Sequence, residues 1–92
     1  MRRKDHFKLG TFSTNCSSGM SVTKIPERWD ASWESNLALS QLLDDAGIDF
    51  MLPIARWIGY GGETNFHGHV LETMTWAAGL LASTKRITVI AT

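Results

Sequence analysis

The chain has 92 residues, of which 43% are hydrophobic, and its nine basic residues balance nine acidic ones. This length suits one small domain or part of a larger one, and the composition is that of a globular chain. A neutral chain offers no electrostatic attraction to nucleic acid or to an anionic membrane, and no apolar segment approaches the length of a membrane span, so we expect neither partner. The single cysteine, Cys16, excludes an internal disulfide and fits a reducing cytoplasm.

Three short apolar segments are predicted to form β-strands. The first is KLGTFS at residues 8–13, after a loose, charged tail over residues 1–7. The second is IDFMLPI at residues 48–54, which is apolar on both faces, as in a strand covered on both sides. The third is RITVIAT at residues 86–92, which is rich in β-branched residues.

Two segments between these strands have the spacing of amphipathic helices. The predicted buried face of the first helix, over residues 32–46, consists of Leu39, Leu42, Leu43 and Ala46. The predicted buried stripe of the second helix consists of Leu71, Met74, Thr75, Ala78, Leu81 and Ala82. Asp30 or Ser32 is expected to cap the first helix, and Gly47 to end it in the left-handed conformation. The methionines at helical spacing and Trp76 are expected to lie in the core.

The alternation of strands and helices predicts an α/β fold with parallel strands joined by crossovers. Three strands form neither a closed barrel nor a wide open sheet, so we interpret residues 1–92 as the N-terminal part of a longer β/α protein. Ligands of such folds bind where the carboxyl ends of the strands meet the following loops. Two long loops occupy these places, at residues 14–30 and 55–69.

The second long loop, residues 55–69, carries candidate ligand-binding groups. Gly59, Gly61 and Gly62 could surround a phosphate, but their spacing matches neither a dinucleotide fingerprint nor a P-loop. We therefore favour the interpretation that they permit positive φ in a tight loop. Arg56 either contacts an anionic or carbonyl-rich ligand or forms a surface salt bridge, and both hypotheses stay open.

The aromatic and histidine residues nearby also allow two interpretations each. Trp57 and Tyr60 stack on a planar ring or pack over the core, and we favour packing. His67 and His69 lack metal-ligand spacing to the nearby acids, so we expect no metal site and favour hydrogen bonding at the entry to the helix. Glu72 is expected in the first turn of the second helix, where it complements the helix dipole.

The first long loop contains the only cysteine of the chain. The thiolate of Cys16 could serve chemistry, but no basic partner is evident, and we favour a buried thiol. Asn15, Ser17 and Ser18 are common turn formers that could also bond a ligand carbonyl.

The order of several motifs resembles the start of the bacterial-luciferase-like flavin monooxygenases, most strongly the branch with the dimethylsulfone and pyrimidine-ring-opening monooxygenases. These motifs are KLGTFS before a long polar loop, the strand entry AGIDF, the aromatic-bearing loop GYGG, and LET…AAGLLASTKRI before the third strand. The resemblance covers residues 8–92. It implies a truncated (β/α)8 TIM barrel with the first three strands and two helices present, since a full barrel needs about 250 residues.

The resemblance implies an oxidoreductase that uses reduced FMN and O2 to oxygenate a small organosulfur or heterocyclic substrate. A separate NAD(P)H-dependent flavin reductase would supply the FMN, and the full-length protein would be a cytoplasmic homo-oligomer. By position, Ala55 and Arg56 would touch the flavin, and Ala91 and Thr92 would lie near its ring. The catalytic residues would belong to later parts of the barrel, so residues 1–92 alone are expected to be inactive.

The same resemblance places three residues on the substrate side, namely Asn15, Cys16 and Trp57. Two other functions stay open. One is a deazaflavin-dependent oxidoreductase of the same superfamily, and the other is a non-catalytic β/α interaction module that needs no flavin.

Overall fold

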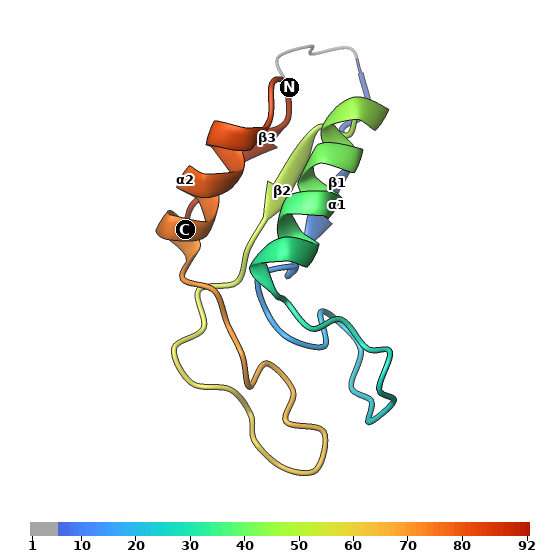
Figure 1. Ribbon diagram of the computed structural model, residues 1–92, viewed down its shortest axis with the longest axis vertical. Coiled ribbons are helices and arrows are strands. Elements are labelled where there is room, and N and C mark those ends of the chain that lie inside the picture. The colour runs from blue at the N-terminus through green and yellow to red at the C-terminus, as the bar shows by residue number, and fades with distance from the viewer. Residues whose placement is uncertain (1–5) are drawn as a thin grey trace.

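The computed structural model describes residues 6–92, which form three strands and two helices in alternation (Figure 1). The elements are β1 at Gly10–Phe12, α1 at Trp33–Ala46, β2 at Phe50–Leu52, α2 at Thr73–Ser83 and β3 at Thr88–Val89. The predicted α/β order is confirmed. Each strand is shorter than its apolar segment, because the segment ends lie outside the paired region.

The predicted loose tail covers residues 1–7, of which residues 1–5 lie outside the described part of the chain. The two described residues are exposed, but the His6 ring reaches the start of β2, with Nε2 3.2 Å from Asp49 Oδ1. The backbone N–H of Leu9 donates to the other carboxylate oxygen of Asp49 at 2.9 Å. This backbone hydrogen bond is the main reason that the pKa of Asp49 is lowered.

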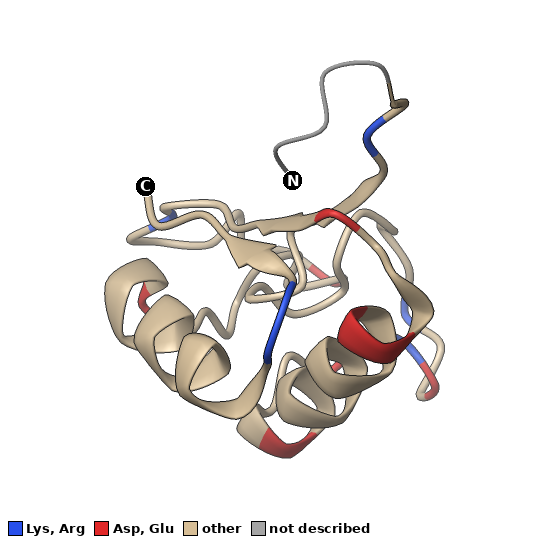
Figure 2. Cartoon of the chain, turned by 90° about the horizontal axis from the view of Figure 1, so that it is seen from above, with Lys and Arg blue, Asp and Glu red and all other residues tan. Residues whose placement is uncertain are grey.

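The three strands form a parallel sheet in the order β1-β2-β3, and both helices lie on the same side of it (Figure 2). Two crossovers that run in the same direction over the same face have the same hand. An open doubly wound sheet has helices on both faces, whereas a β/α barrel has them all on one. The arrangement of these elements is therefore that of consecutive units of a singly wound fold.

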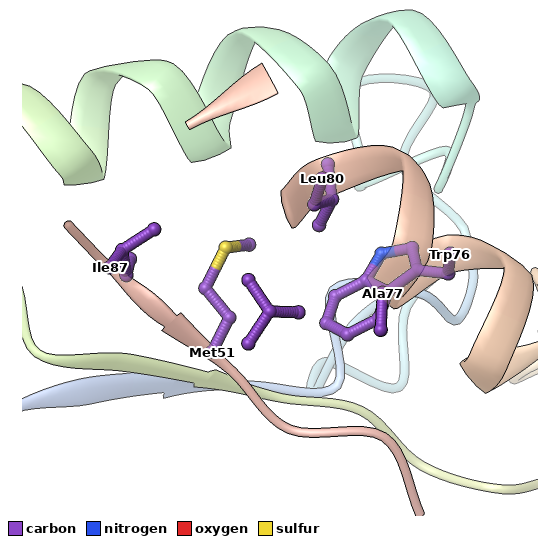
Figure 3. Close-up of a cluster of buried hydrophobic side chains, with 6 residues drawn as sticks. Met51, Trp76, Ala77, Leu80 and Ile87 are labelled. Carbon is purple, nitrogen blue, oxygen red and sulfur yellow. The ribbon is translucent and has the colours of Figure 1, made fainter. Parts of the chain in front are cut away.

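The core lies between β2, β3 and the two helices (Figure 3). Its buried members are Met51, Trp76, Ala77, Leu80, Ile87 and Val89. Met51 points from β2 toward the helices, while its neighbours Phe50 and Leu52 face the other side and are half-buried. The expectation that β2 is covered on both faces is thus not met within residues 6–92. The methionine expectation is also wrong for Met74, which is 69% exposed.

The predicted buried stripe of α2 is wrong. The helix buries Thr73, Trp76, Ala77 and Leu80. Leu71 precedes the helix and is half-buried, and the other predicted residues, Met74, Thr75, Ala78, Leu81 and Ala82, are exposed. Apolar residues surround most of this helix, so periodicity alone does not select a face, and the large Trp76 and Leu80 side chains decide it by filling the core.

The predicted face of α1 is only partly correct. Its residues Leu39 and Leu43 are half-buried against the core, but Leu42 is 66% exposed and Ala46 is exposed. The fully buried row is polar and consists of Asn36, Ser40 and Asp44.

Each member of this polar row has a hydrogen-bond partner. The Nε1–H of Trp76 donates to Asn36 Oδ1 at 2.8 Å, and the Ser40 hydroxyl donates to a carbonyl of its own helix. The Asp44 carboxylate accepts from three consecutive backbone N–H groups at residues 85–87. These bonds lower the pKa of Asp44 and fix the start of β3 to the end of α1.

The predicted ends of α1 are confirmed. Ser32 is the N-cap, with its hydroxyl accepting from the N–H of Ser35 at 3.1 Å, while Asp30 accepts from the N–H of Ser32. Gly47 ends the helix at φ 81°, in the left-handed region that glycine adopts without strain. No helix within residues 6–92 is both long and apolar enough to span a membrane.

Candidate functional site

A cavity of about 600 Å³ opens at the carboxyl ends of β2 and β3, beside the start of α2. Its walls are formed by Ile54, Ala55, Arg56, Trp57, Gly59, His67, Gly68, His69, Val70, Leu71, Glu72, Thr73 and Thr92. Its volume falls within the range of roughly 300–1,000 Å³ that small-molecule sites occupy. The cavity therefore lies where the strand order predicts a ligand site.

The two long loops lie beyond the carboxyl ends of the strands, in the lower part of Figure 1, and are joined to each other by hydrogen bonds. Cys16 and Val70 form an antiparallel bridge between them. The backbone N–H of Ser17 donates to the carbonyl oxygen of His69 at 2.7 Å. The Ser17 hydroxyl accepts from the N–H of His69 at 3.0 Å. This pairing holds the cavity wall at residues 67–71 in a fixed position.

Asn15 anchors this pairing from a fully buried position. Its Nδ2 donates to the carbonyl oxygens of Ile54 and Leu71 at 2.9 and 3.0 Å. Its Oδ1 accepts from the N–H of Ile54 at 2.9 Å. Both amide atoms are thus bonded to the chain, and Asn15 lies behind the cavity wall rather than in it.

Cys16 is likewise fully buried, as a free thiol. Burial raises the pKa of this thiol, which disfavours the thiolate that nucleophilic chemistry would need. The hypothesis of a buried thiol is confirmed.

The glycine-rich stretch forms a small hairpin. The backbone N–H of Tyr60 donates to the carbonyl oxygen of Phe66 at 3.1 Å, and a bridge joins Gly61 to Phe66. Gly61 and Gly62 have φ values of 73° and 77°, so the interpretation that they permit positive φ is confirmed. Gly59 is required for another reason, because a Cβ there would overlap the carbonyl group of the residue at position 67.

Arg56 follows β2 and lines the cavity. Its Nε donates to Nδ1 of His67 at 3.1 Å, and its Nη2 donates to the Tyr60 hydroxyl at 3.0 Å. The guanidinium carbon also lies 4.4 Å from the centre of the Tyr60 ring, in a cation–π contact. Arg56 makes no ion pair within residues 6–92, so the structure gives the salt-bridge hypothesis no support.

His67 is 2% exposed, and its Nε2 lies 2.7 Å from the carbonyl oxygen of Gly19. Its ring stacks on Phe66, with centroids 3.8 Å apart. His67 forms hydrogen bonds as expected, but the predicted placement at the helix entry is wrong, because its ring partners belong to the two long loops. His69 is exposed at the cavity wall. No group of three potential metal ligands occurs in the described part of the chain.

The packing expectation is wrong for Trp57, whose side chain is 93% exposed at the cavity edge. Tyr60 is 66% exposed and stacks on Phe66 within the hairpin, with ring centroids 5.4 Å apart.

Glu72 is the N-cap of α2, one position before the first turn in which it was expected. Its carboxylate accepts from the N–H groups of Met74 and Thr75 at 2.7 and 2.9 Å. These bonds, led by that of Met74, lower the pKa of Glu72 to about 2. The carboxylate is therefore ionised at neutral pH and is held by the helix end.

The predicted site residues divide into three groups. Four of them line the cavity, namely Ala55, Arg56, Trp57 and Thr92, whereas Ala91 is exposed beside it and Asn15 and Cys16 are buried behind its wall. Sequence reasoning did not assign the apolar wall at residues 70–71 to the site. Its position just before the second helix, opposite the end of β2, was the signal that could have identified it.

Comparison with known families shows which proteins the chain is similar to. The profile of the luciferase-like monooxygenase family matches residues 7–92. The chain is 35% identical to the pyrimidine monooxygenase RutA of Acinetobacter baylyi, over 92% of this chain and 23% of that protein. It is 34% identical to the enzyme of the same name from Methylorubrum extorquens, over 97% of this chain and 24% of that protein. The chain thus spans about a quarter of the length of these curated relatives.

Proposed function

The chain belongs to the luciferase-like monooxygenase family, and from this premise we propose that residues 1–92 are the N-terminal part of a (β/α)8 barrel that binds reduced flavin. Two features support the barrel. The strand order β1-β2-β3 with both helices on one face is that of consecutive barrel units (Figure 2). The relatives it matches are about four times as long, which suits a complete barrel of about 250 residues or more.

The observation that carries the flavin proposal is the position of Arg56. It lines the cavity directly after β2, with Nε and Nη2 bonded to the chain, while Nη1 has no hydrogen-bond partner within residues 6–92. A flavin ring has one apolar edge and one edge with two carbonyl oxygens. The free Nη1 suits the carbonyl edge, and the apolar wall at Ile54, Val70 and Leu71 suits the other.

In this proposal, Ala55 and Arg56 contact the flavin from the end of β2, and Ala91 and Thr92 approach it from the end of β3. When bound, reduced FMN supplies the electrons for oxygen activation. The chain itself binds and orients the ring, and its apolar wall keeps water away from the reacting face. Trp57, at the cavity edge, is proposed for the substrate side.

The reaction proposed for the complete protein is the oxygenation of a pyrimidine-type heterocycle by O2. The name of the relatives, pyrimidine monooxygenase, supports a heterocycle over an organosulfur compound. A separate flavin reductase would supply the reduced FMN, and a cytoplasmic homo-oligomer is proposed as the working form.

The test compares two substitutions that each remove one positive charge from the complete product of the gene. Arg56→Ala removes the donor at the cavity, whereas Lys85→Ala removes an exposed cation before β3, at the opposite end of the sheet. The dissociation constant of reduced FMN is measured by anaerobic titration, and oxygen uptake is measured with uracil as the substrate probe.

We expect Arg56→Ala to weaken reduced FMN binding about tenfold, the loss of one hydrogen bond to a polar ring edge. Lys85→Ala should leave the dissociation constant unchanged. Equal affinity in both variants would refute the role of Arg56. Binding of a reduced deazaflavin without binding of FMN would overturn the cofactor assignment.

A further inference from the structure

A continuous path of hydrogen bonds crosses from the first loop to the cavity through one imidazole. It runs from the carbonyl oxygen of Gly19 to Nε2 of His67 at 2.7 Å, and from Nδ1 of His67 to Nε of Arg56 at 3.1 Å. We propose that His67 is a positioning residue that sets the direction of the Arg56 guanidinium in the cavity. The inference rests on the proposed function, because it assigns Arg56 to the ligand.

Two of the three hydrogen-bond partners of the His67 ring fix its tautomer; the third, the Ser13 hydroxyl, lies 3.4 Å from Nε2. A carbonyl oxygen only accepts, so Nε2 carries the proton that it donates to Gly19. The guanidinium only donates, so Nδ1 must present a lone pair to Arg56. An imidazolium has a proton on both nitrogens and would place two donors face to face. The path is therefore complete only with the neutral imidazole that is protonated on Nε2.

The imidazole cannot turn away from this orientation without breaking other contacts. It is 2% exposed and stacks on Phe66 with an interplanar angle of 23°. The main chain of residue 67 has a φ of 58°, and the absence of a side chain at Gly59 allows close approach of the two backbones. A Cβ at position 59 would overlap the carbonyl oxygen of His67.

The consequence for Arg56 is a guanidinium held on three sides. His67 takes its Nε–H, and Tyr60 takes one Nη2–H while covering one face of the group. Flexible arginine side chains lose considerable rotamer entropy when a ligand orders them. Prior fixation by His67 removes part of this cost and leaves Nη1 for the ligand.

The path also joins the two long loops at the cavity. Gly19 belongs to the loop after β1, whereas His67 and Arg56 belong to the loop after β2. A shift of the first loop at Gly19 would therefore reach Arg56 through the imidazole. The same carbonyl accepts from the Ser13 hydroxyl at 3.1 Å, which keeps Gly19 in position from the end of β1.

Two substitutions of His67 separate positioning from packing. His67→Asn keeps an acceptor close to the place of Nδ1 and a residue type that tolerates positive φ, but it loses the donor to Gly19. His67→Leu loses the acceptor and the donor together. Each is made in the complete protein with Arg56 intact and again with Arg56→Ala.

The first readout is the dissociation constant of reduced FMN. With Arg56 intact, we expect His67→Leu to weaken binding about fivefold to tenfold and His67→Asn to restore part of it. In the Arg56→Ala background, the same substitutions should change binding less than about twofold, since they act through the absent guanidinium. Equal losses of FMN affinity with and without Arg56 would overturn the proposal. So would losses of affinity that correlate with the melting temperature of each variant and not with the presence of an acceptor at the place of Nδ1.

The second readout needs no ligand. Long-range proton–nitrogen correlation spectra of the complete protein with labelled histidine report which ring nitrogen of His67 carries the proton. We expect Nε2 protonated and Nδ1 bare, with a change at Nδ1 on Arg56→Ala. A proton on Nδ1 would refute the proposal. A further outcome is that the spectrum is as expected while the unsubstituted protein does not bind FMN. That result would refute the proposed function and the ligand role of Arg56, but the hydrogen bond between His67 and Arg56 would stand.

Discussion

Asn15 hydrogen-bonds the backbone of Ile54 in both directions, donating from Nδ2 to its carbonyl oxygen and accepting at Oδ1 from its N–H, each at 2.9 Å. The side-chain amide thus takes the place of a neighbouring strand at the end of β2. The last backbone bond between the two chain segments lies just before it, from the N–H of Ser13 to the carbonyl oxygen of Leu52 at 2.9 Å. Asn15 therefore extends the sheet to the edge of the cavity.

The first prediction follows from this pair. Asn15→Ala leaves the N–H of Ile54 and the carbonyl oxygen of Leu71 without their side-chain partner, while the carbonyl oxygen of Ile54 keeps the N–H of Arg56. Each part-buried polar group that loses its partner costs about 1–3 kcal/mol. The free energy of unfolding, measured with denaturant, should fall by several kcal/mol. The exposed residue Thr75, mutated to Ser, serves as the control and should change it by less than about 0.5 kcal/mol.

The same variant tests the earlier assignment of Asn15 to the substrate side. If Asn15 is a structural anchor, Asn15→Ala lowers the free energy of unfolding and does not affect the substrate selectively. Asn15→Ala with normal stability and a selectively raised KM for uracil would contradict the anchor and favour the substrate role.

The second prediction concerns the buried contact between α1 and α2. Trp76 is 1% exposed and donates its Nε1–H to Asn36 Oδ1 at 2.8 Å. Trp76→Phe removes this donor and leaves a gap beside a buried amide, so we expect a loss of about 2–4 kcal/mol in the free energy of unfolding. Trp57→Phe changes a side chain that is 93% exposed and should have almost no effect. Similar losses in the two variants would contradict the role of the hydrogen bond and of the core position.

The order of elements could be predicted from the sequence because it depends on local patterns. Short apolar runs and the stop at Gly47 are properties of neighbouring residues, and the structure has β2 and the end of α1 where these signals lie. The buried faces of the helices could not be predicted in the same way. Asn36 and Asp44 are buried because Trp76 and the turn before β3 supply partners from distant parts of the chain.

In the candidate site too, some positions could be predicted from local patterns and others depend on distant parts of the chain. Arg56 and Ala55 could be placed at the ligand end of the sheet, since the residues after a parallel strand must lie there. The positions of Asn15 and Cys16 behind the wall depend on the pairing of two loops that are about 50 residues apart. Neither loop has a periodic pattern, so no sequence signal predicted that pairing.

The third prediction uses the acid dependence of stability at the start of α2. Hydrogen bonds from the N–H groups of Met74 and Thr75 lower the pKa of Glu72 from its ordinary value of 4.5 to about 2. Because the folded-state pKa is the lower one, the unfolded chain takes up the proton first as the pH falls. The stabilisation by Glu72 is therefore fully present above about pH 4.5 and is lost between about pH 4.5 and pH 2.

Glu72→Gln removes this titration and keeps an oxygen at the cap. We expect the variant to be less stable than the unsubstituted protein at pH 7, and the two stabilities to converge as the pH falls toward 2. Denaturant unfolding of both proteins at pH 7, 5 and 3 measures this. Glu27→Gln, at an exposed residue whose side chain makes no hydrogen bond within residues 6–92, is the control and should follow the unsubstituted protein at each pH. A constant difference between Glu72→Gln and the unsubstituted protein across this pH range would show that the carboxylate charge does not stabilise the start of α2.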